Sequence, residues 1–230
     1  MAETIEKVIV INISDSPTGS SDGLVDFFGP SGPIRLLAKG INKPESKNRA
    51  NLLLGSCVEI EYFKARQKGS IGRLKKSTTL YSLDYSNNLN LVFLTRCLKI
   101  FKSLKSKSLP VYNAYFQIIH RLGEGLNKRL LLFILAQSLS YFGIAPITSK
   151  CCACSGSYDL CDFSYYEGGF LCSKHSTSQR WNKELKSIYY LFSDLDKFLS
   201  MSNDAITNYL YAELLDHLEH NGINIEFLRN

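Results

Sequence analysis

A block of cysteines with one histidine, between residues 151 and 175, constrains this chain more than any other part of its sequence. It contains two pairs in which two residues separate the members, Cys151 with Cys154 and Cys172 with His175. This spacing lets two side chains turn back onto one ion, and four sulfur and nitrogen ligands complete a tetrahedral shell around Zn²⁺. Because such a shell leaves no position for water, the block predicts one structural zinc ion per chain.

Two further thiols leave the choice of ligands open. Cys152 could replace Cys151, although a single residue would then separate it from Cys154, and Cys161 lies between the two pairs. Thiols buried without a metal are the plainer alternative, since cysteine often packs as a small hydrophobic residue. The regular spacing of the two pairs favours the metal.

The location of the protein is suggested by what the sequence lacks. Its N-terminus does not have the basic and then apolar form of a secretory signal, and its longest apolar stretch is well short of the ~20 residues that span a bilayer. We therefore expect a cytoplasmic protein without membrane contact. In that reducing compartment its seven cysteines would be metal ligands and free thiols.

Positive charge is concentrated in the first half of the chain. Residues 1–110 carry 17 Lys and Arg against 9 Asp and Glu, a charge of +8, and residues 111–230 carry 10 against 12, a charge of −2, which together give the +6 of the whole chain. A basic half joined to a slightly acidic half suggests a module that binds a polyanion and a second module with another role. Nucleic acid is the leading polyanion.

The first eighty residues predict a small β-barrel. Five stretches of alternating or β-branched residues are separated by turns rich in Gly, Pro and Ser, at residues 5–13, 24–28, 34–38, 56–63 and 71–83. Such a series is typical of a five-stranded OB-type barrel, which binds oligonucleotides on a curved face and two flanking loops. An SH3-like barrel is the alternative.

Helical periodicity takes over from residue 89. Helices are expected at about 89–105, 110–122, 126–142, 182–199 and 205–218, the first burying a face that includes Leu91, Leu94 and Phe101. The third is apolar on most sides and predicts a buried hub. The fold class is therefore α+β in two domains, an OB-fold barrel at 1–83 and an α-helical domain at 84–230 with a zinc module at 151–175.

The order of these elements and several local motifs resemble the bacterial RecO family of recombination mediators. The similar stretches are Ile-Arg-Leu-Leu-Ala-Lys-Gly at 34–40, Val-Glu-Ile-Glu-Tyr at 58–62, and the helical stretch at 130–135 that leads to Phe-Gly-Ile-Ala-Pro at 142–146. The metal block is the most specific of them. It departs from the family at its last ligand, where zinc-bearing members have Cys and this chain has His175, and at Ser155, where many members have Gly.

The resemblance implies an N-terminal OB domain, a helical C-terminal domain and a zinc module that only some members keep. It also implies a protein that binds single- and double-stranded DNA, anneals complementary strands and helps to load the recombinase RecA onto DNA covered by single-strand-binding protein. RecR is an implied partner, and filaments of RecA an indirect one. The implied location is the bacterial nucleoid, and no bond-breaking activity is implied.

Basic residues of the barrel half are the predicted DNA contacts. A single surface cation is more often simply solvated, but a set that contacts phosphates gives sequence-independent affinity that falls with salt. Tyr62 and Phe63 are candidates to stack bases, although one of the two is expected in the core. The predicted set is Arg35, Lys39, Lys43, Lys47, Arg49, Lys64, Arg66, Lys68, Arg73, Lys75 and Lys76.

A second basic set is expected on the helices. Arg96, Lys99 and Lys102 form a stripe along the first helix, and Lys128 with Arg129 is a rival position. From the resemblance, either could receive the acidic, Phe-ending tail of single-strand-binding protein. A solvated helix face is an equally good explanation of these residues.

Two other functional classes stay open. A zinc-dependent nucleic-acid-modifying enzyme would need an open metal position and a general base, for which Glu167 is the candidate, but it has no motif around it and no catalytic residue is predicted. A protein scaffold that binds no DNA is the third class. The sequence contains no phosphate-binding loop of the G-x-x-x-x-G-K-[ST] type, so no use of ATP is expected.

Overall fold

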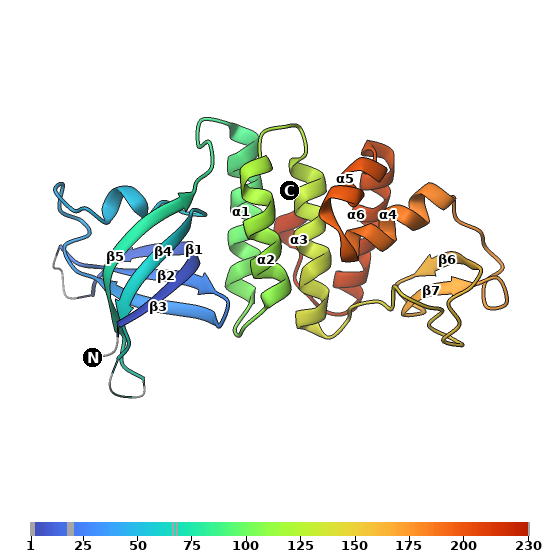
Figure 1. The fold of residues 1–230 in the computed structure, drawn as a ribbon, viewed down its shortest axis with the longest axis horizontal. Coiled ribbons are helices and arrows are strands. Elements are labelled where there is room, and N and C mark those ends of the chain that lie inside the picture. Colours follow the sequence, from blue (N-terminus) through green and yellow to red (C-terminus); the bar gives the residue numbers. More distant parts are fainter. Residues whose placement is uncertain (1–2, 18–20, 66, 68, 230) are drawn as a thin grey trace. The chain divides into compact units, whose positions relative to one another are not determined.

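The computed structural model of the chain describes residues 3–17, 21–65, 67 and 69–229. They form two compact units, which join in sequence between Gly125 and Leu126 (Figure 1). No helix in these ranges is long and apolar enough to cross a membrane.

The first unit begins with five strands, which are β1 (Glu3–Asp15), β2 (Gly23–Gly29), β3 (Gly32–Ala38), β4 (Cys57–Phe63) and β5 (Gly72–Tyr81). They close into a barrel in the order β1-β2-β3-β5-β4, because β4 pairs back onto β1. Every pair is antiparallel except β3 with β5, in which Leu36 and Leu37 lie beside Gly72 and Arg73. This is a five-stranded Greek-key arrangement, so the predicted OB-type barrel is confirmed.

Alternating side chains fill the barrel. On β4, Val58, Ile60 and Tyr62 are buried in the barrel core, while Glu59 and Glu61 are only half-buried. The strand therefore presents one apolar and one polar face, as its sequence alternation predicts. The inward-facing residues of the other strands complete this core, among them Val8, Val10, Val25, Phe27, Leu36 and Leu74.

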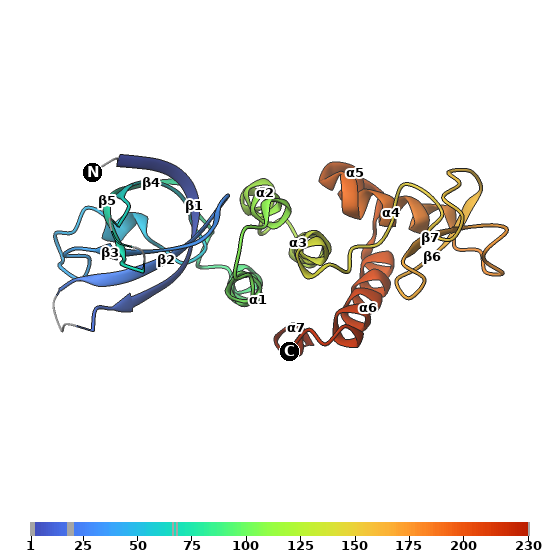
Figure 2. The same ribbon diagram turned by 90° about the horizontal axis from the view of Figure 1, so that it is seen from below.

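Two helices pack onto the barrel and belong to the same unit, α1 (Asn88–Ser103) and α2 (Leu109–Ile118). Figure 2 shows them side by side. The ring of Phe101 lies between Phe28 of β2 and Tyr115 of α2, with centroid distances of 5.2 and 5.1 Å. The buried Tyr115 hydroxyl donates a hydrogen bond of 2.8 Å to the carbonyl oxygen of Gly55. The compact unit thus extends beyond residue 83, where the sequence predicts the end of the barrel domain.

The second unit is built around α3 (Asn127–Phe142), which is buried along nearly its whole length between Leu130 and Leu139. The predicted hub is therefore confirmed. The other helices of this unit are α4 (Asn182–Ser193), α5 (Leu195–Met201), α6 (Asp204–His220) and α7 (Glu226–Arg229), and α4 and α6 contact α3. Two short 3₁₀ helices, η1 (Arg49–Asn51) and η2 (Ile119–Arg121), lie in the first unit.

The single helix expected at 182–199 is wrong, because the structure has two helices there. The backbone of Asp194 is extended, which ends α4, and its carboxylate accepts a hydrogen bond of 3.0 Å from the backbone N–H of Lys197. Asp194 is therefore the N-cap of α5. The apolar periodicity continues across this break, which hides it in the sequence.

Gly55 lies where α1 and α2 leave no room for a side chain. Its φ is +81°, and a Cβ at this position would lie 2.3 Å from Cδ1 of Leu94 and 3.0 Å from the Tyr115 hydroxyl. Gly125 has a similar φ of +75° but no atom within 4 Å of such a Cβ. The two glycines therefore separate the effect of packing from the effect of backbone strain.

We predict that Gly55→Ala lowers the free energy of unfolding by at least about 3 kcal/mol, because overpacking adds to the strain of a positive φ. Gly125→Ala should cost about 1 kcal/mol, from strain alone. Urea unfolding followed by circular dichroism measures both variants. Equal losses would contradict the close packing of α1 and α2 over Gly55.

Candidate metal centre and nucleic-acid interface

The cysteine-rich module of the second unit is built on a hairpin of two strands, β6 (Leu160–Ser164) and β7 (Gly169–Cys172). A bridge to Ile147 fixes the start of the module. The backbone N–H of Ile147 donates to the carbonyl of Gly168 at 2.8 Å, and that of Phe170 donates to the carbonyl of Ile147 at 3.0 Å. Only glycine fits at 169, because a Cβ there would lie 2.2 Å from the Ile147 oxygen.

The structure brings the four predicted ligands together from two turns. In the first turn, the N–H of Ser155 donates to the carbonyl of Cys151 at 2.8 Å, which folds Cys154 back beside Cys151. In the second, which follows β7, the N–H of His175 donates to the carbonyl of Cys172 at 2.8 Å. The four ligand atoms all lie within 4.8 Å of one another.

The distances between these atoms fit a tetrahedral metal ion. The Sγ atoms of Cys154 and Cys172 are 3.9 Å apart, and Nδ1 of His175 lies 3.3 Å from Sγ of Cys172 and 3.8 Å from Sγ of Cys151. Metal bonds of about 2.0–2.3 Å separate neighbouring ligands of a tetrahedral ion by about 3.4–3.8 Å. Four protein ligands fill this shell. Glu167, the general base of the enzyme hypothesis, is exposed in the turn between β6 and β7.

The Cys151 thiol is prepared for metal binding. Burial by itself raises the pKa of this thiol, but backbone hydrogen bonds from Cys154, Cys172 and Ala153 outweigh it and lower the pKa to about 6. The pKa of Cys154 is raised by its neighbouring thiols and by burial, although the backbone N–H of Gly156 opposes this. The Cys151 thiol is therefore shifted toward the thiolate, which is the form of cysteine that binds metals.

The two alternative thiols lie outside the one cluster found in the described part of the chain. Cys152 packs with Leu160 against the buried Cys151, and burial raises the pKa of its thiol. The Cys161 sulfur lies 3.8 Å from the carbonyl oxygen of Ser178, and burial raises the pKa of this thiol too. Among the ligand sets considered, the geometry favours the one that contains Cys151.

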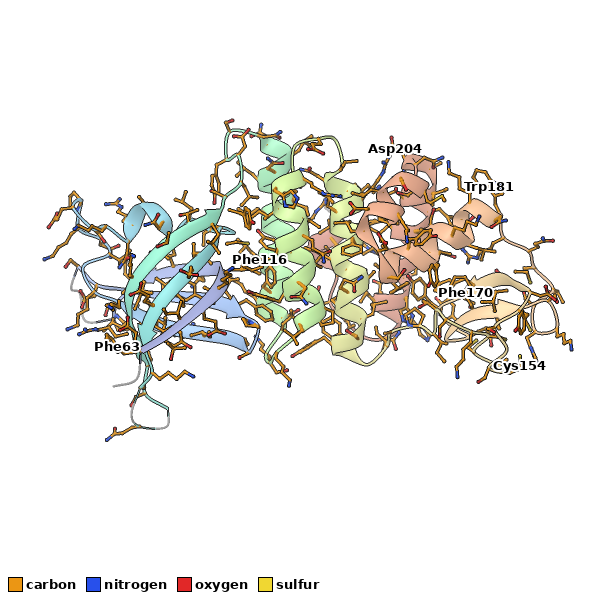
Figure 3. The ribbon with its side chains drawn as sticks, viewed as in Figure 1. Phe63, Phe116, Cys154, Phe170, Trp181 and Asp204 are labelled. Atoms are coloured by element: carbon orange, nitrogen blue, oxygen red, sulfur yellow. The ribbon has the colours of Figure 1, made fainter. Side chains whose placement is uncertain are left out.

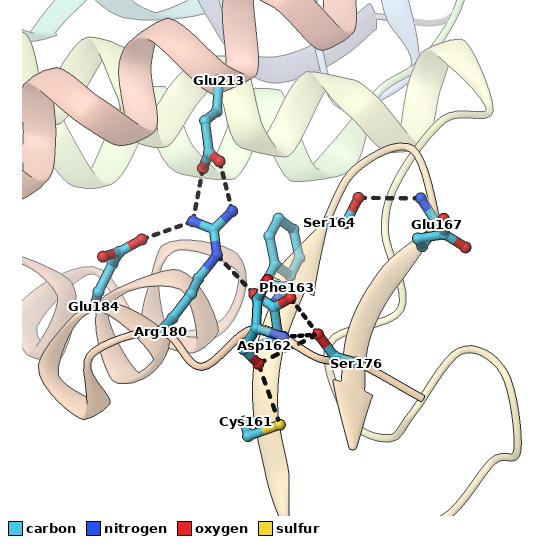
Figure 4. Close-up of polar contacts among 10 residues, drawn as sticks. Cys161, Asp162, Phe163, Ser164, Glu167, Ser176, Arg180, Glu184 and Glu213 are labelled. Carbon is cyan, nitrogen blue, oxygen red and sulfur yellow. Dashed lines mark hydrogen bonds and ion pairs between the residues drawn. The ribbon is translucent and has the colours of Figure 1, made fainter. Parts of the chain in front are cut away.

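An arginine that carries no sequence signal fastens the module to the helices (Figure 4). The side chain of Arg180 is only 15% exposed and is paired with three carboxylates. Its guanidinium nitrogens lie 3.1 Å from a carboxylate oxygen of Asp162 on β6 and 2.6 Å from one of Glu184 on α4. They lie 2.5 and 3.0 Å from the two carboxylate oxygens of Glu213 on α6. Burial would lower the pKa of Arg180, but its hydrogen bonds with Glu213 and Glu184 raise it. One side chain therefore joins three elements of the second unit.

The cations predicted to bind DNA differ in their surroundings. Three of them form ion pairs, which are Arg35 with Asp26, Lys75 with Glu3 and Glu61, and Lys76 with Glu61. Six others are exposed and make no ion pair within the described ranges, namely Lys39, Lys43, Lys47, Arg49, Lys64 and Arg73. Arg66 and Lys68 lie outside the described residues. The exposed, unpaired cations are the better candidates for phosphate contacts.

The loop of residues 39–51 is fixed along β5. The side-chain oxygen of Asn48 accepts two hydrogen bonds from Ser77, one from the backbone N–H at 2.9 Å and one from the hydroxyl at 3.1 Å. The side-chain amide of Asn51 donates to the Ser77 carbonyl at 3.0 Å. Lys47 and Arg49, which flank Asn48, are thereby held near the cations of β5.

An open pocket of about 480 Å³ lies at the hairpin between β4 and β5, and Phe63, Lys64 and Arg73 are among its lining residues. The guanidinium carbon of Arg73 is 5.6 Å from the centroid of the half-buried Phe63 ring. Figure 3 labels Phe63 at this edge of the barrel. Tyr62, in contrast, is in the core, and its hydroxyl donates a hydrogen bond of 3.0 Å to Glu6. Phe63 is therefore the aromatic residue that a base could reach.

The two rival positions on the helices differ as well. The α1 stripe consists of the half-buried Arg96 and the exposed Lys99 and Lys102. Lys128 donates a hydrogen bond of 2.5 Å to Asn208, and Arg129 pairs with Asp204 at 2.8 Å. These contacts hold the start of α3 against α6. Lys128 and Arg129 thus have a structural role at the start of α3.

Two family models match this chain, Recombination protein O N terminal over residues 1–83 and Recombination protein O C terminal over residues 105–202. A DNA repair protein RecO of Bacillus mycoides (strain KBAB4) is 24% identical over 180 residues, which cover 74% of this chain and 71% of that protein. The DNA repair proteins RecO of Bacillus cereus (strain AH187) and Bacillus anthracis (strain CDC 684 / NRRL 3495) are each 23% identical over 185 residues. Those residues cover 76% of this chain and 73% of each relative.

We predict that Arg180→Ala lowers the free energy of unfolding by about 3–5 kcal/mol, because it leaves three partly buried carboxylates without a partner. Arg180→Lys should recover only part of this loss, since an ammonium group lacks the fork of donors that meets all three. Urea unfolding of each variant measures the effect.

Arg229→Ala is the matched control, because Arg229 forms an exposed pair with Glu219 in which the side chains are 52% and 56% exposed. Its stability should stay within about 0.5 kcal/mol of wild type. A loss in Arg180→Ala no larger than in this control would contradict the joining role of Arg180.

Proposed function

The chain belongs to the RecO family of DNA repair and recombination proteins, and from this premise we propose that it is a recombination mediator. It binds single- and double-stranded DNA, anneals complementary strands and helps to load the RecA recombinase onto DNA coated by single-strand-binding protein. RecR is a further partner of the protein, and RecA filaments are an indirect partner. It acts without bond-breaking catalysis, in the cytoplasm at the bacterial nucleoid.

The observation that carries this proposal is the set of exposed, unpaired cations of the barrel, two of which, Lys64 and Arg73, line the Phe63 pocket. Lys47, Arg49, Lys64 and Arg73 have no carboxylate partner within the described ranges. Phosphates can therefore neutralise them without first breaking an ion pair. Contacts of this kind give affinity for any sequence, and the half-buried Phe63 ring adds a surface on which an unpaired base can stack.

Annealing follows from the same electrostatics. Two complementary strands repel each other through their phosphates, and cations that contact only the backbone lower this repulsion while the base edges stay available for pairing. Nucleotide hydrolysis is not needed for this step. The sequence accordingly has no phosphate-binding loop.

The metal ion of the proposed centre is zinc, one per chain. Three thiolates and one imidazole in a closed tetrahedral shell are a typical structural zinc site. The ion would hold the turn at Cys151–Cys154 against the turn at Cys172–His175, and Arg180 carries this fixed module on α4 and α6. Its role is therefore to stabilise the second unit, while DNA contacts belong to the barrel.

Partner contact is proposed for the α1 stripe of Arg96, Lys99 and Lys102. Two of these cations are exposed, and a positive helix face complements the acidic tail of single-strand-binding protein. Charge reversal at Lys99 and Lys102 would then weaken binding of the tail peptide without changing binding of bare DNA.

We predict that Lys64→Gln with Arg73→Gln weakens binding of a labelled single strand by at least about tenfold and lowers the slope of log affinity against log salt by about 1.4, because two phosphate contacts are lost. Fluorescence anisotropy over a range of salt concentrations measures both quantities.

Lys75→Gln with Lys76→Gln removes the same charge and is the control. Its effect should be smaller, since Glu3 and Glu61 already pair with these lysines. Equal losses in the two double variants would show that the pocket at Phe63 has no special part in binding.

The mediator function itself is tested with complementary strands coated by single-strand-binding protein. The wild type should accelerate annealing, and the Lys64→Gln with Arg73→Gln variant should lose most of this acceleration. A wild type that binds DNA tightly but leaves the annealing rate unchanged would refute the proposed function while leaving DNA binding intact.

Removal of the metal provides a separate prediction. The purified protein should contain about one zinc ion per chain, and a chelator or Cys172→Ser should lower its thermal midpoint, because the two turns lose their common ligand. Cys161→Ser should change neither the zinc content nor the midpoint, since Cys161 lies outside the cluster. A wild type that is free of zinc and equally stable with chelator would refute the zinc assignment.

A further inference from the structure

The outer face of α4 carries aromatic and basic side chains together. The inner face of this helix, with Ser187, Ile188 and Leu191, is buried in the second unit. On the outer side, Tyr189 is 46% exposed, and Trp181 at the N-cap is 61% exposed. The other members of this aromatic-basic face are the exposed Lys186 and the half-buried Lys183 and Tyr190.

Cations and rings are in contact on this face. The ammonium of Lys183 lies 5.9 Å from the centroid of the Trp181 ring, and that of Lys197, from α5, lies 5.4 Å from the centroid of the Tyr190 ring. The rings of Tyr189 and Tyr190 are 5.3 Å apart at 70°. A ligand here would therefore meet ring faces and positive charge at the same time.

The carboxylates of Glu184 and Asp194 pair with Arg180 and Lys197, so among the cations on this face they neutralise Lys197 alone. Glu184, the acidic residue of α4, is paired with Arg180 at 2.6 Å, and Asp194 at its end pairs with Lys197 at 3.3 Å. Lys183 and Lys186 make no ion pair in the part of the chain that the structure describes. The aromatic-basic face thus has a local excess of positive charge, although its half of the chain is slightly acidic overall.

We propose that the aromatic-basic face of α4 binds single-stranded nucleic acid. Bases would stack on Trp181 and Tyr189, and backbone phosphates would lie against Lys183 and Lys186. Trp181 and Tyr189 are eight positions apart, a rise of about 12 Å along the helix axis, which is the length of about three to four stacked nucleotides at 3.4 Å each. Rings interleaved with cations are the typical surface for single strands, because every base has a face that can stack.

This site goes beyond the proposed function of the barrel and does not depend on it. With one strand on the barrel and another on α4, a single chain could hold both partners of an annealing reaction. The two sites use different residues of different units, so each can be removed by substitution while the other stays.

Trp181 makes the test direct, because it is the one tryptophan of the chain. A thymidine oligonucleotide that stacks on it should quench the tryptophan fluorescence of the full-length protein. Lys183→Glu with Lys186→Glu, and separately Tyr189→Leu, should raise the oligonucleotide concentration needed for half-maximal quenching by roughly tenfold or more. Lys107→Glu with Lys150→Glu changes the charge equally at exposed positions elsewhere and should leave quenching unchanged.

The outcomes separate this proposal from the proposed function. Quenching that persists in the barrel variant Lys64→Gln with Arg73→Gln supports the α4 site even if that variant no longer anneals DNA. Unquenched wild-type fluorescence at saturating oligonucleotide would overturn the proposal. It would also be overturned by unchanged quenching in folded α4 variants, or by quenching with an acidic, Phe-ending peptide but not with the oligonucleotide. Zinc content and thermal midpoint verify that each variant is folded.

Discussion

The arrangement of the second unit depends on the ion pairs of the Arg180 guanidinium. It meets Asp162 of the hairpin, Glu184 of α4 and Glu213 of α6 at once, so the hairpin cannot shift without separating a buried charge from its partners. A metal ion can only order the residues that bind it. Arg180 joins the hairpin to the helices, and it pairs with Glu184, the acidic residue of α4.

Ion pairing also distinguishes two kinds of cation on the barrel. Arg35, Lys75 and Lys76 are already paired with neighbouring carboxylates, while Lys64 and Arg73 line a pocket together with the half-buried Phe63 ring. Net charge alone does not distinguish these two kinds of residue. The distinction matters because a phosphate gains little from a lysine that must first leave its glutamate.

Local patterns determined which features could be predicted from the sequence. The ligand pairs follow from a spacing of two residues, and the barrel follows from the alternation seen in Val58 to Tyr62, because both are set by neighbours in the chain. Arg180 could not be found, since its partners lie up to 33 residues away. Leu91 was expected on the buried face of α1 but is 37% exposed, because Phe93 and Ile100 face the core instead. Ser155 differs from the family's glycine, yet its φ of +60° explains why glycine suits this position.

The pairing of β1 determines when its two edges become covered during translation. This first strand needs β4, which is completed at Phe63, and its Lys7 carbonyl also accepts a hydrogen bond of 2.8 Å from the Tyr112 hydroxyl of α2. The first strand of the barrel is therefore covered on both edges only when the fourth strand has formed. Until β4 has emerged as far as Phe63, one edge of β1 is free to pair with other chains, so nascent barrels are most exposed to aggregation during translation.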